Sequence, residues 1–482
     1  MPLHNKAFWG IVFFLIGILF AGFVNYWQEG FLIIVLAAFI TALTFLVFNN
    51  ANRGKFKWFA GLTLFMVFGA GYYLVFDNNQ KNINIPYDKN SVIEGLVIDV
   101  SKSLVSQTLV LKLLPPHKGN IQIMSDKYPE FKYGDILRVN GSIRRPSDSA
   151  SNYFEKEGIF GLSGFSKIEI LEKGKGSRAR GFLFAIKSFV ESSFNRFLPK
   201  EKSSFMSGLI LGETSEFDKK FKEKMSITGT THLVALSGYN ITIIAKAIVL
   251  SLGIWLSRRK TFWISLVAIF GFVVMTGSDA SVVRAAIMAV LVLLADRLER
   301  AYSFRNSIAI AAFLMILFNP KILLFDIGFQ LSFAAVMGLI YLKPAIHMAF
   351  KIKNESGILA WRENLTTTLS AQAAVLPIIL SNFGLFSPIS LATNVLILTF
   401  IPITMFLGAM VVVLGIFSDI LAQVFAWIAN IFLSYELWII DVFAKIKLQI
   451  SVQNFSIVIS IIYYFLLIGL IMHSKKKSDY LS

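Results

Sequence analysis

Long apolar runs, separated by short polar connections, make up most of this chain of 482 residues. A helix needs about 20 apolar residues to cross the ~30 Å hydrocarbon layer of a bilayer. Runs of roughly this length lie near residues 7–24, 31–48, 56–76, 232–256, 261–276, 282–296, 305–318, 322–342, 366–381, 390–417, 421–442 and 455–472. The pattern predicts a polytopic α-helical membrane protein with about twelve transmembrane helices.

One polar stretch, residues 80–172, interrupts this pattern. Apolar and polar residues alternate in Val92–Val100, and shorter runs of the same kind follow as far as Leu171. Pro115–Pro116 and Arg145–Pro146 supply turn signals between the runs. About five short strands in one insert predict a small β-barrel domain, for which an OB-like fold is the first choice.

Residues 173–202 predict a basic amphipathic helix. Phe182, Phe189 and Phe197 fall on one side of this helix, and Lys187 falls on the other. The segment holds eight Lys and Arg residues against two Glu residues. We expect this helix to lie on the anionic headgroups of membrane lipids.

Lys and Arg residues between the apolar runs set the predicted orientation. When the spans are threaded in order, the cluster Arg258–Lys260 and most others like it fall on one side. The positive-inside rule makes that side the cytoplasm, which then holds both termini, and places the inserted barrel outside the inner membrane. The predicted domains are transmembrane helices in 1–79, the OB-like domain in 80–172, the interfacial helix in 173–202, a transmembrane channel domain in 203–474 and a cytoplasmic tail in 475–482.

Composition supports a membrane protein and removes several kinds of chemistry. Hydrophobic residues make up 55% of the chain, charged residues make up 16%, and the net charge is +17. The chain has no cysteine, which excludes disulfides and thiolate sites. Its five histidines are far apart in sequence, and no P-loop is present. We therefore predict no metal, no cofactor and no nucleotide-hydrolysing motor within the chain.

Polar side chains inside apolar runs are the candidates for function, because each must find a partner or face water. Arg284 is the most costly of them, and its guanidinium fork suits phosphate oxygens, although an ion pair with Asp279 is a structural alternative. Two interpretations of these polar side chains stay open: they line one shared polar path, or they form separate hydrogen bonds between helices. The channel-lining candidates are His232, Ser237, Gly238, Asn240, Asp279, Arg284, Asp326, Gln330, Gln372 and Asn394.

His232 and Ser237 also suggest an intramembrane serine hydrolase. The two residues are five apart, which is ~140° around a helix, so they would not meet on one continuous helix. A break at Gly238 would bring them closer. The alternative is a kinked helix in which Ser237 and Asn240 satisfy the freed backbone groups.

The stretch from Gly208 to Ala245, GLILGETSEFDKKFKEKMSITGTTHLVALSGYNITIIA, resembles the signature region of the ComEC competence-channel family. Three later stretches match the same family, SVVRAAIMA from Ser281, DIGFQLSFAAVMGL from Asp326 and AQAAVLPIILSNFG from Ala371. In the insert, YGDILRVNGSI and NYFEKEGIFGLSG resemble its OB-like domain. The resemblance covers nearly the whole chain.

This resemblance implies an inner-membrane channel for single-stranded DNA in natural transformation, and it implies no catalytic residue. Expected partners are single-stranded DNA and membrane lipids, with a separate DNA receptor, a separate nuclease and a cytoplasmic ATPase; a homodimer is also open. The chain ends a few residues after Lys477, without the metallo-β-lactamase-like domain of many members. Tyr239 and Asn240 stand where the common form has Leu-His.

The insert itself gives a mixed indication of DNA binding. Residues 88–172 hold 11 basic and 11 acidic residues, a net charge of 11 − 11 = 0. A structural lid is therefore the alternative to a strand-binding groove, which needs cations and stacking aromatics. The DNA-binding candidates are Arg138, Arg144, Arg145, Tyr128, Tyr133 and Tyr153. Other functions for the whole chain are transport of another anionic solute or of a lipid or polysaccharide precursor, and a scaffold without a pore.

Overall fold

A computed structural model describes residues 3–26, 53–80, 83–88, 90–164, 167–236, 238, 240–241, 243, 256–299, 301–350, 361–452 and 455–479. The chain divides into two compact units, which are described separately. The first unit contains residues 1–181 and 286–326, and the second contains 182–285 and 327–482. The predicted span at 31–48 and most of the span at 232–256 lie outside the described residues.

In the first unit, α1 (Leu3–Tyr26) packs closely along α3 (Arg53–Gln80). Two glycines allow this approach. A Cβ atom on Gly17 would lie 1.9 Å from the carbonyl oxygen of Met66, and one on Gly69 would lie 2.2 Å from that of Phe14. Small residues at such contacts are typical of helices packed in a membrane. The short helices α12 (Phe304–Phe318) and α13 (Ile322–Phe325) also belong to this unit.

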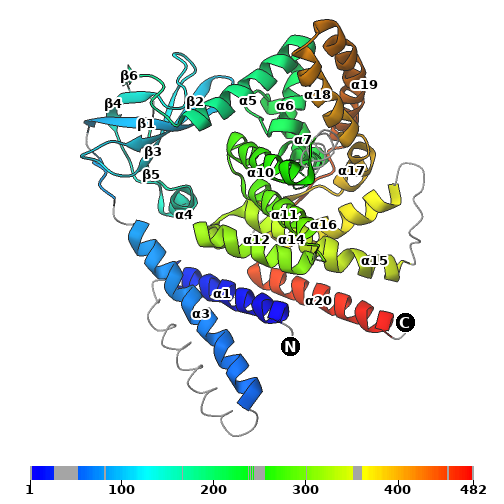
Figure 1. The fold of residues 1–482 in the computed structure, drawn as a ribbon. Coiled ribbons are helices and arrows are strands. Elements are labelled where there is room, and N and C mark those ends of the chain that lie inside the picture. The colour runs from blue at the N-terminus through cyan, green and yellow to red at the C-terminus, as the bar shows by residue number, and fades with distance from the viewer. Residues whose placement is uncertain are drawn as a thin grey trace. The chain divides into compact units, whose positions relative to one another are not determined.

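The predicted insert forms a six-stranded sheet with the order β5-β3-β2-β1-β4-β6 (Figure 1). Neighbouring strands are antiparallel, except for β3 and β5, which are parallel. Alternate residues face one buried core that includes Leu109, Leu111 and Ile121. The strands are β1 (Asn90–Lys102), β2 (Ser106–Leu113), β3 (Asn120–Asp126), β4 (Ile136–Ser142), β5 (Ile159–Ser163) and β6 (Lys167–Glu172).

The small OB-like β-barrel that the sequence predicts is not confirmed: in the described residues the sheet does not close into a barrel, and β6 occupies the second edge of β4. One antiparallel bridge, between Arg144 and Leu162, joins the chain just beyond β4 to β5. The sequence also did not predict α4 (Asp148–Lys156), which lies between β4 and β5. The insert is therefore a sheet domain with one helix.

Buried charges join α4 to the helices of the same unit. Lys321, only 2% exposed, places its Nζ 2.8 Å from Asp77 Oδ1 at the end of α3 and 2.6 Å from Glu155 Oε2 on α4. Beside it, Lys156 Nζ lies 2.7 Å from Asp326 Oδ2. We call these five residues the Lys321 junction. It fixes the base of the sheet domain against α3 and α13.

The second unit is almost entirely helical. Its two β segments are only two residues long, and its largest core gathers around α6, α18 and α19. Its elements are most of α5 (Arg178–Phe197), then α6 (Lys200–Leu211), α7 (Lys219–Thr228), α8 (Thr231–Val234), α10 (Arg258–Met275), the start of α11 (Ala280–Arg297), α14 (Ile327–Met337), the π-helix η1 (Gly338–Leu342), α15 (Lys343–Ala349), α16 (Trp361–Phe383), β7 (Leu385–Phe386), α17 (Ser390–Leu398), α18 (Ile401–Gly415), α19 (Asp419–Ala444), β8 (Ile450–Ser451) and α20 (Ile457–Asp479).

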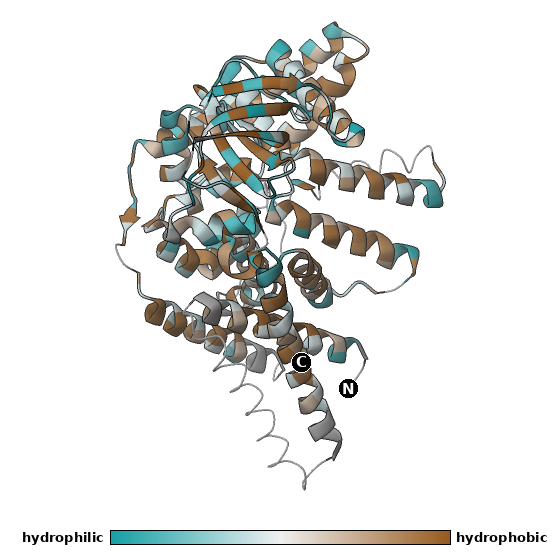
Figure 2. Ribbon diagram, turned by 90° about the vertical axis from the view of Figure 1, so that its left-hand side faces the viewer, coloured by the Kyte–Doolittle hydropathy of each residue, from teal (hydrophilic) through white to brown (hydrophobic). Residues whose placement is uncertain are grey.

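Several helices suit a membrane. Among the described residues, five helices are long and apolar enough to cross it, and α17 with α18, bent by 48°, would make a sixth. Figure 2 shows hydrophobic colour along most helices and alternating colour along the strands. A helical membrane-type architecture is therefore confirmed, whereas the predicted twelve spans are not. The five helices are His4–Phe23, Ala60–Gln80, Ile327–Met348, Asp419–Ala444 and Ile457–Ser474.

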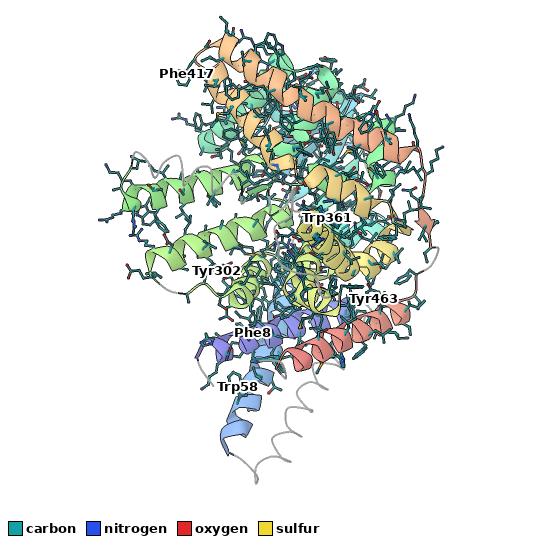
Figure 3. All side chains as sticks on the ribbon, turned by 90° about the vertical axis from the view of Figure 1, so that its right-hand side faces the viewer. Phe8, Trp58, Tyr302, Trp361, Phe417 and Tyr463 are labelled. Atoms are coloured by element: carbon teal, nitrogen blue, oxygen red, sulfur yellow. The ribbon has the colours of Figure 1, made fainter. Side chains whose placement is uncertain are left out.

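Large apolar side chains cover the outside of these helices. Phe417, after the end of α18, is 80% exposed, and Figure 3 shows it projecting away from the ribbon. Trp361, at the start of α16, is also exposed. An exposed apolar surface of this kind is expected where lipid, not water, surrounds the helices.

Candidate functional site

Helical structure is interrupted twice in this region, once after α7 and once after α8. Helix α7 ends at Gly229, whose φ of +64° is in the left-handed region that favours glycine. After the single turn of α8, the backbone is extended at Ala235. Each break leaves carbonyl groups without a partner inside the helix. We call the described residues 227–236, 238, 240 and 241 the broken segment.

Side chains from α11, from α17 and from the loop that precedes α17 satisfy those carbonyl groups. The hydroxyl of Ser387 donates to the carbonyl of Ile227, and Thr393 Oγ1 donates to that of Thr228 over 3.2 Å. The hydroxyl of Ser281 donates to the carbonyl of Leu236. The broken segment is thus held by hydroxyl donors, which replace the missing backbone N–H groups.

Arg284, on α11, lies directly against the second break. A Cβ atom on Gly238 would be 3.2 Å from Arg284 Nη2, so the glycine leaves room for the guanidinium. Arg284 is 6% exposed, donates to the carbonyl of Ser332, and has its Cζ 5.5 Å from the centre of the Phe333 ring. Its Nε–H has no partner among the described residues. The structure therefore places a buried cation with one free donor beside the broken segment.

His232 and Gln372 are each linked to the first break, at Gly229. His232 Nδ1 lies 3.0 Å from the carbonyl oxygen of Gly229. Gln372, on α16, donates from Nε2 to Ser390 Oγ over 2.8 Å, and a Cβ atom on Gly229 would lie 2.3 Å from that of Ser390. His232 therefore bonds directly to the backbone at this break, and Gln372 approaches it through Ser390.

Asn240 and Asn394 are buried between helices. Asn240, 3% exposed, donates from Nδ2 to the carbonyl of Leu209 on α6 over 3.0 Å. Asn394, 2% exposed, has an Oδ1 atom without a partner among the described residues. The polar groups of this unit therefore join helices to one another in the arrangement seen here.

Comparison with known proteins covers this region. A family model described as competence protein matches residues 209–477, which is more than half of the chain. The chain belongs to the competence protein family. Every element of the broken segment described above lies within the part that matches the family.

One curated relative is similar to about half of this chain. It is ComE operon protein 3 of Bacillus subtilis (strain 168), which is 29% identical over 250 residues. The match covers 51% of this chain and 31% of the relative, so the chain spans about a third of the length of the relative. No solved structure matches this competence family chain.

The remaining channel-lining candidates do not join the broken segment in one cluster. Ser237 lies outside the described residues, Asp279 is exposed just before α11, and Gln330 is half-buried on α14. Asp326 belongs to the first unit, where it pairs with Lys156 in the Lys321 junction. Burial alone would lower the pKa of Lys156, but Asp326 and the neighbouring Glu157 raise it above its usual value.

Sequence analysis missed one buried acid in the competence region. Glu436 on α19 is fully buried, and its Oε1 accepts a hydrogen bond from Thr404 Oγ1 over 2.6 Å. Its Oε2 has no partner among the described residues. The signal was available, because Glu436 is an acidic residue within the predicted span 421–442.

The DNA-binding candidates of the sheet domain differ in what they offer. Arg138 forms an ion pair with Glu94, in which Arg138 Nη2 lies 2.8 Å from Glu94 Oε1. The Tyr133 hydroxyl accepts a hydrogen bond from the backbone N–H of Ser177 over 3.2 Å. By contrast, four candidates expose their side chains, namely Tyr128, Arg144, Arg145 and Tyr153.

Proposed function

We propose that this chain forms the inner-membrane channel through which a single strand of DNA enters the cell in natural transformation, and that it acts without catalysing a reaction. The observation that carries this proposal is the broken segment. It lies in the region matched by the competence family and sets a buried guanidinium beside a line of hydroxyl donors. The description of the matching family, competence protein, names the process that this proposal extends to the present chain.

The chemistry of the broken segment suits a polyanion. Ser281, Ser387 and Thr393 are hydrogen-bond donors that now bond to backbone carbonyl groups. Arg284 adds a positive charge, and its Nε–H has no partner in the part of the chain that the structure describes. If the broken segment shifts, these donors become available to phosphate oxygens. A pathway for phosphates needs such polar and cationic groups and no ring of carboxylates.

The sheet domain supports the same proposal through its topology. Strands β1, β2 and β3 run in order, β4 pairs with β1, and β5 pairs with β3 in parallel. The bridge between Arg144 and Leu162 brings the two ends of this order together. An OB-fold is a partly open five-stranded barrel that binds single strands, so we propose an OB-like domain outside the membrane.

The proposal also assigns tasks to other proteins. The sequence contains no P-loop, so a cytoplasmic ATPase supplies the energy for transport. A separate receptor delivers the DNA, and a separate nuclease degrades the second strand. Both termini of the chain lie in the cytoplasm in this scheme.

The decisive experiment is transformation of a deletion strain complemented with Arg284→Glu. A carboxylate cannot donate to the carbonyl of Ser332 and would repel phosphate, so we expect transformation to fall by about 100-fold or more. Arg297→Glu, with the same charge change on an exposed turn of α11, should transform within about threefold of wild type. Membrane fractionation checks that both variants insert.

Normal transformation by Arg284→Glu would contradict a pathway at the broken segment. Normal transformation by the deletion strain itself would contradict the proposed function. The second result would favour transport of another anionic solute, because broken helices lined by polar groups also occur in transporters.

A further inference from the structure

A pocket of about 410 Å³ lies in the first unit, where the end of α3 meets the sheet domain. Its walls include apolar side chains such as Ile83 and Phe160, together with a few polar groups. Small-molecule sites in proteins have this character and volumes of roughly 300–1,000 Å³. None of its lining residues belongs to the broken segment, so it is a separate feature.

Arg145 presents an unused guanidinium to this pocket. Its Cζ lies 4.6 Å from the centre of the Tyr87 ring, and Tyr87 is held in place because its hydroxyl donates to the carbonyl of Phe160 over 2.9 Å. Arg145 forms no ion pair with any residue that the structure describes. A guanidinium stacked on one ring keeps its second face and its N–H edge for a ligand. A base stacks on such a face, and a phosphate binds such an edge.

The other polar groups of the pocket fit a ligand that carries both a phosphate and a base. Lys321 and Glu155 line it, but they are paired to each other over 2.6 Å, so the carboxylate is not a free negative charge. Lys321 is paired with Asp77 as well, so Arg145 is the cation of this lining that has no carboxylate partner among the described residues. Gln80 Oε1 is buried and has no hydrogen-bond partner within the described ranges. An amide without a partner suits the hydrogen-bonding edge of a base.

We propose that this pocket binds one nucleotide of a DNA single strand, with its phosphate on the edge of Arg145 and its base against the open face of the same guanidinium. This inference rests on the proposed function and names a contact point for the strand at the base of the sheet domain. Lys321 and Glu155, two members of the Lys321 junction, line the pocket, so the bound nucleotide is held where the sheet domain meets the helices of the first unit.

The test measures binding of a fluorescein-labelled oligothymidylate to the full chain in phosphatidylcholine nanodiscs by fluorescence anisotropy. Arg145→Ala should weaken binding roughly 10- to 100-fold, because a charged hydrogen-bonding group and a stacking surface are lost together. The control is Lys112→Ala. Lys112 is exposed on β2 of the same sheet domain and carries the same charge, but it does not line the pocket, so its removal should change binding less than about threefold.

Two competition experiments identify the class of ligand. Thymidine monophosphate should displace the oligonucleotide at lower concentration than inorganic phosphate does. Displacement by phosphatidylglycerol in the nanodisc, and not by thymidine monophosphate, would mean a lipid headgroup site and would overturn the proposal.

A second variant, Arg145→Lys, keeps the charge without the planar fork and should still lose most of the binding. Loss of binding in this conservative variant would not be explained by misfolding of the alanine variant.

Equal binding by wild type, Arg145→Ala and Lys112→Ala would overturn the pocket proposal, as would absence of binding to wild type. If the deletion strain still loses transformation in that case, the channel proposal stands without the pocket. If the deletion strain transforms normally, the proposed function has failed, whatever the binding result.

Discussion

At the scale of single residues, the second unit buries polar side chains that depend on a few hydrogen bonds within the protein. Glu436 is the strongest example, because it is fully buried on α19 and Thr404 supplies its only hydrogen bond among the described residues. A buried carboxyl group with one hydroxyl partner and no cation partner depends strongly on that hydroxyl.

Replacing Thr404 with Val keeps the shape of the side chain and removes the donor. We expect the free energy of unfolding to fall by about 1–3 kcal/mol, because Glu436 is then left without a partner. Thermal unfolding in detergent measures this loss. Thr404→Ser keeps the hydroxyl and should lose less, so equal unfolding temperatures for the Val and Ser variants would contradict this account.

At the scale of elements, glycine decides how closely α1 and α3 pack. Gly69 faces the backbone of α1 at Phe14, whereas Gly71, on the same helix, has nothing within 4 Å of the position where a Cβ atom would be. The two residues thus separate the effect of contact from the effect of helix propensity.

Gly69→Ala should destabilise the protein by about 1–3 kcal/mol, because the new methyl group forces α1 and α3 apart. Gly71→Ala should be neutral or stabilise by up to about 1 kcal/mol, because alanine favours a helix more than glycine does. Thermal unfolding of the two purified variants makes the comparison. Equal stability of both would show that the helices do not approach each other as described.

Elements were easier to predict from sequence than the contacts between them. Period-2 alternation gave the strands, and long apolar runs gave most of the helices, because both patterns reflect which face of an element is buried. Alternation does not say which edges pair, so the open sheet and its edge strand β6 were not foreseen. Helix α4 was missed because it is nine residues long and carries no long apolar stripe.

The sequence predicted several residues of the candidate site, but it did not predict which of them contact one another. Polar residues in apolar runs identified Arg284, Gln372 and Asn240, and all three make hydrogen bonds inside the second unit. Sequence could not show that Asp326 pairs with Lys156 on α4, because that pair joins positions 170 residues apart. Contacts of this range depend on the tertiary fold and leave no local periodic signal.

At the scale of the whole molecule, the Lys321 junction is the attachment between the sheet domain and the helices of the first unit. Lys321 neutralises two carboxylates, Asp77 and Glu155, in a buried position. Removing one member of a buried charge cluster is costly, since the remaining charges lose their partner.

Lys321→Met should therefore release α4 while the sheet stays folded. We expect an effect of about 3–5 kcal/mol, seen in hydrogen exchange as loss of protection in α4 and at the end of α3, with β1 to β3 unchanged. Lys102→Met breaks an exposed pair with Glu130 and should change protection by less than about 1 kcal/mol. Uniform loss across the sheet would instead show that the domain cannot fold without the junction.

The Lys321 junction also has a consequence for biosynthesis. Asp77 and Glu155 leave the ribosome long before Lys321, and N-terminal segments generally fold first during translation. The sheet can thus finish folding while both acids are still hydrated and ionised. The ion pairs of Lys321 with Asp77 and Glu155 form only after the later segment that carries Lys321 has been inserted. A sheet domain that is held by these ion pairs therefore indicates that insertion has reached at least Lys321.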